Sequence, residues 1–152
     1  RTPIMYAAWS GNKKNFDYLI DKGAQKLNVS TKDETILIFA AAGGHPAIMD
    51  QVLGWDVDIN QQDYKGNTAL HYAVAEDDIA TVEKIYEKGG KALMANDKGE
   101  TAVDWAIEVA AYDSMLFFSR KLELSKKEYW GPIKEHFTSR FWRRRFKSYL
   151  VK

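Results

Sequence analysis

The sequence lacks cysteine and any long apolar run. Its 152 residues include no cysteine, which excludes disulfide frameworks, thiol nucleophiles and thiolate metal sites. The longest apolar run spans residues 36–42 and is far shorter than the roughly 20 apolar residues that cross a bilayer. No basic segment followed by an apolar stretch opens the chain, so the sequence shows no secretion signal. We therefore expect an intracellular protein, in the cytoplasm, with no membrane-spanning segment.

A large net charge is also lacking, because two opposite charges nearly cancel. The formal net charge is +1. Residues 126–152 carry nine lysines and arginines against two glutamates, a charge of +7, which leaves −6 for residues 1–125. This division between an acidic body and a basic tail is a clue to the kinds of partner that the chain binds. The chain opens at Arg1 rather than Met, and we expect it to be a piece of a longer protein.

What the sequence does contain is a repeat of 33 residues. Four of its seven threonines are spaced 33 residues apart, at Thr2, Thr35, Thr68 and Thr101. Four residues after each of them stands an aromatic residue: Tyr6, Phe39, Tyr72 and Trp105. Five residues after each stands an alanine: Ala7, Ala40, Ala73 and Ala106. A unit of this length cannot bury its own apolar face, so the units must stack on one another.

Within each repeat the pattern predicts two antiparallel helices and a hairpin loop. Each repeated threonine precedes an apolar stretch and can accept a hydrogen bond from the free amides of a first helical turn, so the first helices should begin near these threonines. The small alanines let the paired helices approach closely. Gly23 and Gly89 can take the left-handed conformation that ends a second helix, and Gly66 and Gly99 fit tight turns at hairpin tips.

The repeats resemble those of the ankyrin family. The third repeat carries most of that family's pattern, in Asp63, Gly66, Thr68, Ala69, Leu70, His71 and Ala73. The second supplies Gly44-His45, and the fourth has Asp104 and Ala110 where the family has His and Gly. The resemblance covers about residues 1–122 and implies an all-α solenoid of stacked helix-turn-helix repeats. We divide the chain into an array at 1–124, with repeats at 1–29, 30–62, 63–95 and 96–124, and a basic helical extension at 125–152.

Residues suited to catalysis are sparse. His45 and His71 stand at positions that the resemblance makes structural, which favours hydrogen bonds between repeats over catalysis. No two histidines have metal-ligand spacing, and Gly43-Gly44 is not followed by the Gly-Lys-Ser/Thr of a phosphate-binding loop. Glu76-Asp77-Asp78 is interpreted as a solvated turn, with too few ligands for calcium. We therefore predict no enzyme activity, no metal, no cofactor and no small-molecule substrate.

The resemblance also implies a partner-binding surface on the concave side, which the first helices and the hairpin tips line. We predict that ten residues there contact a partner: Trp9, Lys32, Glu34, Tyr64, Lys65, Asn67, Glu76, Glu100, Asp104 and Glu108. Glu100, Asp104 and Glu108 are spaced i, i+4 and i+8, which predicts one shared helical face. Ion pairing with Lys65 and Lys98 is the alternative role for these three carboxylates.

The basic tail predicts a second binding surface. A capping-box pattern at 125–128 and Gly131-Pro132 precede a predicted last helix. On that helix a second apolar stripe is turned by about 150° from the first, which leaves it for an intermolecular contact. Seven residues of this helix are predicted to bind a partner: Arg140, Trp142, Arg143, Arg144, Phe146, Lys147 and Tyr149.

Three functions compete at this point. The leading hypothesis is a non-enzymatic protein-interaction module or scaffold within a larger protein or assembly, which binds a protein through the concave face and the last helix. A second is nucleic-acid (RNA) binding by the arginines and aromatic residues of the tail, with affinity that falls steeply with salt. A third is attachment of the basic tail to an anionic membrane, which liposome flotation would separate from the second.

Overall fold

The computed structural model describes residues 1–123, and in this range it contains eight helices and no strand. The helices are α1 (Pro3–Ser10), α2 (Lys13–Asp21), α3 (Ile36–Gly43), α4 (Pro46–Leu53), α5 (Ala69–Ala75), α6 (Ile79–Glu87), α7 (Ala102–Glu108) and α8 (Tyr112–Lys121). The predicted all-α class is confirmed. Arg1–Phe117 forms one compact unit, and a second begins at Phe118. The extension predicted at 125–152 lies outside the described residues.

The repeated threonines set the phase of the helices. They are the N-cap residues of α1, α3, α5 and α7, each in extended backbone conformation. The Oγ1 atom of Thr35 accepts the amide of Ile38 at 3.2 Å, and that of Thr101 accepts the amide of Asp104 at 3.2 Å. These bonds satisfy amides that have no partner inside the helix. The predicted starts of the first helices are therefore confirmed.

A left-handed residue separates the two helices of every pair. Gly11 and Gly44 occupy this position with φ of 72° and 64°, and Asp77 and Ala110 occupy it with φ of 53° and 58°. A β carbon at Gly11 would overlap the ring of His45, so glycine is required there for space as well as for conformation. Asp77 and Ala110 adopt the same conformation with a β carbon, which is strained.

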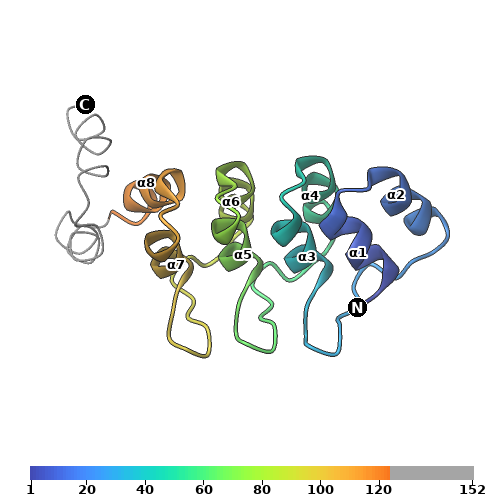
Figure 1. Cartoon of the computed structure of the whole chain (residues 1–152), viewed down its shortest axis with the longest axis horizontal. Coiled ribbons are helices and arrows are strands. Elements are labelled where there is room, and N and C mark those ends of the chain that lie inside the picture. The colour runs from blue at the N-terminus through green and yellow to red at the C-terminus, as the bar shows by residue number, and fades with distance from the viewer. Residues whose placement is uncertain (124–152) are drawn as a thin grey trace. The chain divides into compact units, whose positions relative to one another are not determined.

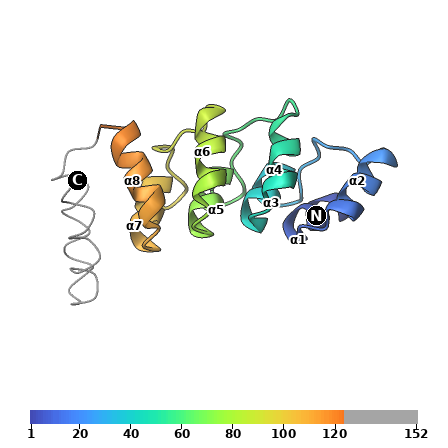
Figure 2. The ribbon, with the colours of Figure 1, turned by 90° about the horizontal axis from the view of Figure 1, so that it is seen from above.

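The helix pairs stack in sequence order. Helix α1 packs on α3, α3 on α5 and α5 on α7, while α2 packs on α4 and α4 on α6. Figure 1 shows these pairs side by side, with the loops that precede α3, α5 and α7 extending from one edge, and Figure 2 shows the same order from above. Ala40 and Ala73 are completely buried between neighbouring helices, as their small size predicts.

The hairpin loops are built on one hydrogen-bond scheme that repeats three times. The amides of Ser30, Asp63 and Asn96 donate to the carbonyls four residues later, at 2.9, 2.9 and 2.8 Å. The side-chain oxygens of the same three residues each accept the amides two and four residues later. Backbone bonds also join the tips, because the amides of Tyr64 and Asp97 donate to the carbonyls of Lys32 and Lys65 at 3.0 Å each. The loops therefore form a fixed edge of the array.

His71 joins the third repeat to the fourth. Its Nδ1 accepts the backbone amide of Thr68 at 3.1 Å, so the proton lies on Nε2, which donates to the carbonyl of Glu100 at 3.2 Å. The ring is completely buried, and this burial lowers the pKa of His71. The hydrogen bond between repeats that the sequence predicts for this histidine is present at Nε2, while Nδ1 is engaged by Thr68 of the same repeat.

Candidate partner-binding site

A groove lies where the first helices meet the hairpin loops. It has a volume of about 460 Å³ and is lined by Arg1, Tyr6, Trp9, Glu34, Ile38, Phe39, Ala42, Tyr64, Lys65 and Tyr72. We call these ten residues the aromatic groove. Apart from Arg1, which precedes α1, they come from α1, α3, α5 and the loops that precede α3 and α5. Four of the residues predicted to bind a partner meet here: Trp9, Glu34, Tyr64 and Lys65.

Three aromatic side chains of the groove are open to solvent. Tyr6, Trp9 and Tyr64 are 50%, 54% and 46% exposed. Tyr6 and Trp9 are three residues apart on α1 and so lie on the same side of that helix. Exposed aromatic side chains beside a cavity can be buried by a partner, and Trp and Tyr are the residue types that most often anchor such contacts.

The floor of the groove is held in place by packing and hydrogen bonds. The Phe39 ring lies under Tyr6, with 6.4 Å between ring centroids. The hydroxyl of Tyr72 donates to Oδ2 of Asp63 at 2.6 Å. Burial, followed by this hydrogen bond, raises the pKa of Tyr72 to about 12, so its proton stays on the oxygen at neutral pH. The groove therefore has a preformed shape.

Sequence reasoning missed Tyr6, Phe39 and Tyr72 as residues of the site. The signal was present, because an aromatic residue recurs at this position in every repeat. Periodicity alone does not distinguish a residue that packs inside from one that lines a groove. The structure makes the distinction, since Phe39 is buried while Tyr6 is half exposed.

The side chain of Glu34 is hydrogen-bonded within the array, to Arg1 and to the loop that precedes α3. Arg1 holds it with two hydrogen bonds, Nη2 to Oε1 at 2.7 Å and Nε to Oε2 at 3.0 Å, and Ser30 Oγ donates to Oε2 at 2.8 Å. The bonds from Arg1 hold the pKa of Glu34 below its usual range. Its charge is balanced inside the groove, and only 7% of the residue is exposed. The hydrogen bonds to Arg1 and Ser30 already engage both oxygens of this carboxylate.

Asn67 and Glu100 also have internal roles. Asn67 is 4% exposed, and its Oδ1 accepts the side-chain amide of Asn96 at 2.9 Å. Oε2 of Glu100 accepts from Asn96 Nδ2 and from the indole of Trp105, both at 3.0 Å, and these bonds lower the pKa of Glu100. The helical face predicted for Glu100, Asp104 and Glu108 is wrong, because Glu100 precedes the N-cap and only the other two lie on α7.

The remaining acidic residues lie apart from the aromatic groove. Oδ2 of Asp104 accepts both the amide and the hydroxyl of Thr101, at 2.8 and 2.6 Å, and so caps α7. Glu76 and Glu108 are exposed at the ends of α5 and α7. Asp78 caps α6 by accepting the amide of Thr81 at 3.2 Å. The seven predicted tail residues, from Arg140 to Tyr149, lie outside the described part of the chain.

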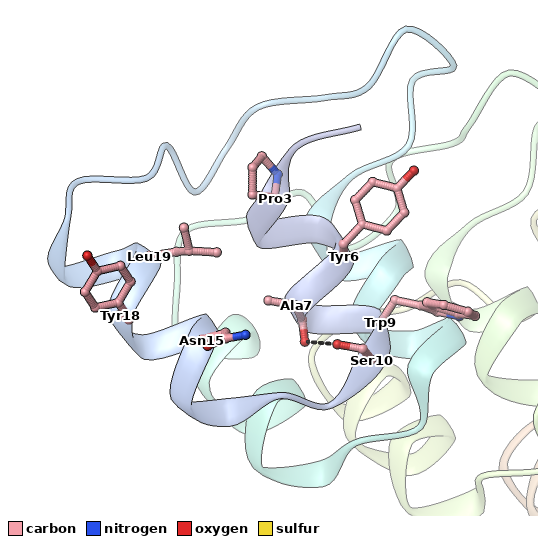
Figure 3. A pocket seen from close by; sticks show the side chains of 8 residues that line it. All are labelled: Pro3, Tyr6, Ala7, Trp9, Ser10, Asn15, Tyr18 and Leu19. Carbon is pink, nitrogen blue, oxygen red and sulfur yellow. Dashed lines mark hydrogen bonds between the residues drawn. The ribbon is translucent and has the colours of Figure 1, made fainter.

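A second hollow, of about 440 Å³, lies on the outer side of the first helix pair, where α1 and α2 supply its lining (Figure 3). Tyr6 and Trp9 project to one side of α1 in this view, and Tyr18 and Leu19 stand on α2 at the other side. Pro3 and Asn15 are exposed here, whereas the residues at their positions in the other three repeats are buried. This face is thus the stacking face of the first repeat.

Comparison with known families agrees with this architecture. The family model described as "Ankyrin repeats (3 copies)" matches residues 37–124, and the model described as "Ankyrin repeat" matches residues 1–34. The chain belongs to the ankyrin repeat family. Ankyrin repeats are generally protein–protein interaction modules. The family therefore supplies a general role for the array and leaves its partner open.

Curated ankyrin relatives are much longer than this chain. The mitochondrial disaggregase of Homo sapiens is 45% identical over 49 residues, which is 32% of this chain and 7% of that protein. A transient receptor potential cation channel subfamily A member 1 homolog of Caenorhabditis elegans is 30% identical over 108 residues, 70% of this chain and 9% of that protein. The ADP-ribosylation factor GTPase-activating protein AGD2 of Arabidopsis thaliana is 29% identical over 84 residues, which is 55% of this chain and 11% of that protein. This ankyrin chain thus spans about a tenth or less of these relatives.

None of the helices within residues 1–123 combines the length and the apolar character needed to cross a membrane. Over the same residues, no three side chains of His, Cys, Asp or Glu come together in a way that could hold a metal ion.

Proposed function

We propose that this ankyrin array is a non-enzymatic protein-binding module, which holds a protein partner in the aromatic groove as part of a larger protein or assembly. The observation that carries the proposal is the set of exposed aromatic side chains, Tyr6, Trp9 and Tyr64, gathered around one cavity. Large apolar surfaces that stay wet are costly, and on soluble proteins they mark binding sites. The groove lies on the first helices and hairpin loops, the side that binds partners in this family.

The groove is well suited to binding because its shape is set before a partner arrives. Tyr72 is fixed by Asp63, Glu34 by Arg1, and the loops by their repeated backbone bonds. Little side-chain freedom is lost on binding, so more of the contact energy is retained as affinity. Full burial of Trp9 or Tyr64 by a partner would contribute roughly 1.5–3 kcal/mol each.

Three titratable groups of the array, two of which line the groove, support binding in preference to catalysis. The Glu34 carboxylate is bonded to Arg1, and the Tyr72 hydroxyl is bonded to Asp63. His71 is buried, with both ring nitrogens engaged. A general acid or base needs a proton that it can exchange with a substrate, and these three groups are committed to internal bonds.

The experiment that tests this function is affinity capture with matched variants. The tagged full chain, Trp9→Ala, Tyr64→Ala and Tyr18→Ala are incubated with an extract of the native source, and captured proteins are quantified by mass spectrometry. Tyr18 is an equally exposed aromatic residue, at 59%, that lies outside the aromatic groove. We expect one set of proteins to be retained by wild type and Tyr18→Ala and reduced about tenfold or more by the groove variants.

Two results would count against the proposal. Retention of the same proteins by a Trp9→Ala, Tyr64→Ala double variant would place the contact elsewhere. Loss with Tyr18→Ala but not with Tyr64→Ala would place it on the stacking face of the first repeat. Unchanged melting temperatures of all variants, measured by circular dichroism, show that the fold is intact in each.

A further inference from the structure

Three lysines stand at the same position of successive hairpin loops. Lys32, Lys65 and Lys98 are separated by 33 residues, and each is exposed. The carbonyls of Lys32 and Lys65 accept the backbone amides of Tyr64 and Asp97 in the next loops, at 3.0 Å each. The backbone under the three ammonium groups is therefore fixed from repeat to repeat. We call these residues the lysine row.

Two members of the row converge on the aromatic groove. The Nζ atoms of Lys32 and Lys65 lie 5.0 and 5.3 Å from the centre of the Tyr64 ring, which lines the groove. Within residues 1–123 neither lysine forms an ion pair, whereas the third cation of the region, Arg1, is paired with Glu34. The groove thus has two ammonium groups beside it that hold no carboxylate.

Within the described residues, the carboxylates of the same loops form no ion pair with these lysines. Glu34, Asp63 and Glu100 are held by Arg1, by the Tyr72 hydroxyl and by Asn96 with Trp105, respectively. The loops also carry Asp33 and Asp97, which are exposed and flank the row but do not line the groove. Asp63 and Glu100 keep their negative charge, because the groups that donate to them are neutral, but neither residue lines the groove. The lining itself holds two cations, Arg1 and Lys65, against one anion, Glu34, which gives a net charge of +1, and the Lys32 ammonium beside Tyr64 adds to it.

We infer that the groove binds an acidic peptide segment of its partner, with one aromatic or large aliphatic side chain between Trp9 and Tyr64 and carboxylates on Lys32 and Lys65. This inference rests on the proposed function, since it names the chemistry of the segment that the groove takes. Cations at the rim of an apolar site select a partner of opposite charge and speed its association. A neighbouring carboxylate also gains from the aromatic ring, because Tyr64 keeps both ammonium groups close to one point.

The test uses the full chain and four labelled nonapeptides in fluorescence anisotropy. The first peptide has a central Phe flanked on each side by two Glu residues in a Gly/Ser background. In the others, Gln replaces every Glu, Lys replaces every Glu, or Ala replaces the Phe. We expect the acidic Phe peptide to bind about tenfold more tightly than the Gln and Ala peptides, and the Lys peptide to bind least. The affinity of the acidic Phe peptide should decrease as the salt concentration is raised.

Variants locate the charge contact on the protein. We expect Lys32→Gln with Lys65→Gln to weaken binding of the acidic Phe peptide about tenfold, to the level of the Gln peptide. Because residues 126–152 also carry a net positive charge, the matched control changes two lysines there, Lys126→Gln with Lys127→Gln. That control should bind as wild type does. Trp9→Ala should remove the preference for Phe over Ala.

Each contrary result is distinct. Equal binding of the Glu and Gln peptides, with loss in Tyr64→Ala, would overturn the acidic partner and leave the groove as the binding site. Loss with the tail pair, but not with Lys32 and Lys65, would assign acidic ligands to the tail. Failure of every peptide to bind, or displacement of the acidic peptide by an RNA oligonucleotide that needs the same two lysines, would overturn the inference. The capture experiment judges the proposed function separately.

Discussion

Nε2 of His71 lies 3.2 Å from the carbonyl oxygen of Glu100, a residue of the next repeat. A second bond of the ring, in which Nδ1 accepts the amide of Thr68 at 3.1 Å, requires the ring to be neutral, because Nδ1 must keep a lone pair for it. Protonation would place a second proton where that amide donates. The same buried ring therefore makes one bond that protonation would break, to Thr68, and the bond that joins two repeats, to Glu100.

The first prediction concerns stability at mildly acidic pH. Burial lowers the pKa of His71, so the unfolded chain, with a pKa of about 6.5 there, binds this proton more readily than the folded chain. The contribution of His71 is thus fully present above about pH 6.5 and is lost as pH falls below it, by about 1.4 kcal/mol for each unit by which the two pKa values differ. Urea unfolding at pH 7.5 and 5.5 measures the change.

A matched pair of variants assigns that change to one histidine. His71→Gln should reduce the difference in unfolding free energy between the two pH values, while His45→Gln, at the less buried N-cap of α4, should retain it. Protonation of Glu34 does not interfere, because its pKa is held below the usual range and the stability that depends on this carboxylate is lost only below the two pH values compared. An unchanged pH dependence in His71→Gln would refute the assignment.

The second prediction concerns the buried alanines. Ala40 and Ala73 have no exposed surface, so Ala40→Leu or Ala73→Leu should overpack the contact between helices and cost about 1–3 kcal/mol. Ala80→Leu is the control, because Ala80 is exposed on α6. Chemical denaturation compares the three variants. Wild-type stability in both buried variants would show that the alanines are not needed for close packing.

The third prediction concerns the strained turns between paired helices. Ala110 has φ of 58° at the position that Gly11 and Gly44 occupy in the first two repeats. Ala110→Gly should stabilise the fold by about 0.5–1 kcal/mol, because glycine has no β carbon to oppose this conformation. Ala80→Gly, in the first turn of a regular helix, should give no such stabilisation. Two destabilised variants would mean that the turn is not strained by Ala110.

Much of the fold could be predicted from the sequence because one signal repeats. A threonine before each apolar stretch caps a helix by a local hydrogen bond, so its spacing alone sets the phase of α1, α3, α5 and α7. The role of His71 followed from its place in the same pattern. These features depend on residues at fixed positions of the repeat, and such positions can be recognised in a single sequence.

The candidate site was less accessible to that reasoning. Glu34, Asn67 and Glu100 share one position of the repeat and were predicted to meet a partner, but their side chains are held by Arg1, Asn96 and Trp105. The partners Arg1 and Asn96 lie 33 and 29 residues away in sequence from Glu34 and Asn67, so the internal bonds of these two side chains depend on how the repeats stack. The sequence shows that Tyr6 and Tyr72 belong to a set of aromatic residues repeated every 33 residues. How far each of them is exposed depends on how the repeats stack.

The most direct test of the central claim, that a protein partner occupies the aromatic groove, is photo-crosslinking in the native source. The photoreactive residue benzoylphenylalanine replaces Tyr64, in the groove, or Leu93, an exposed residue that does not line it. After irradiation, the protein-binding account predicts an adduct of defined mass with position 64 and none with position 93. An adduct at position 93 alone, or none at position 64 under conditions where capture succeeds, would contradict it.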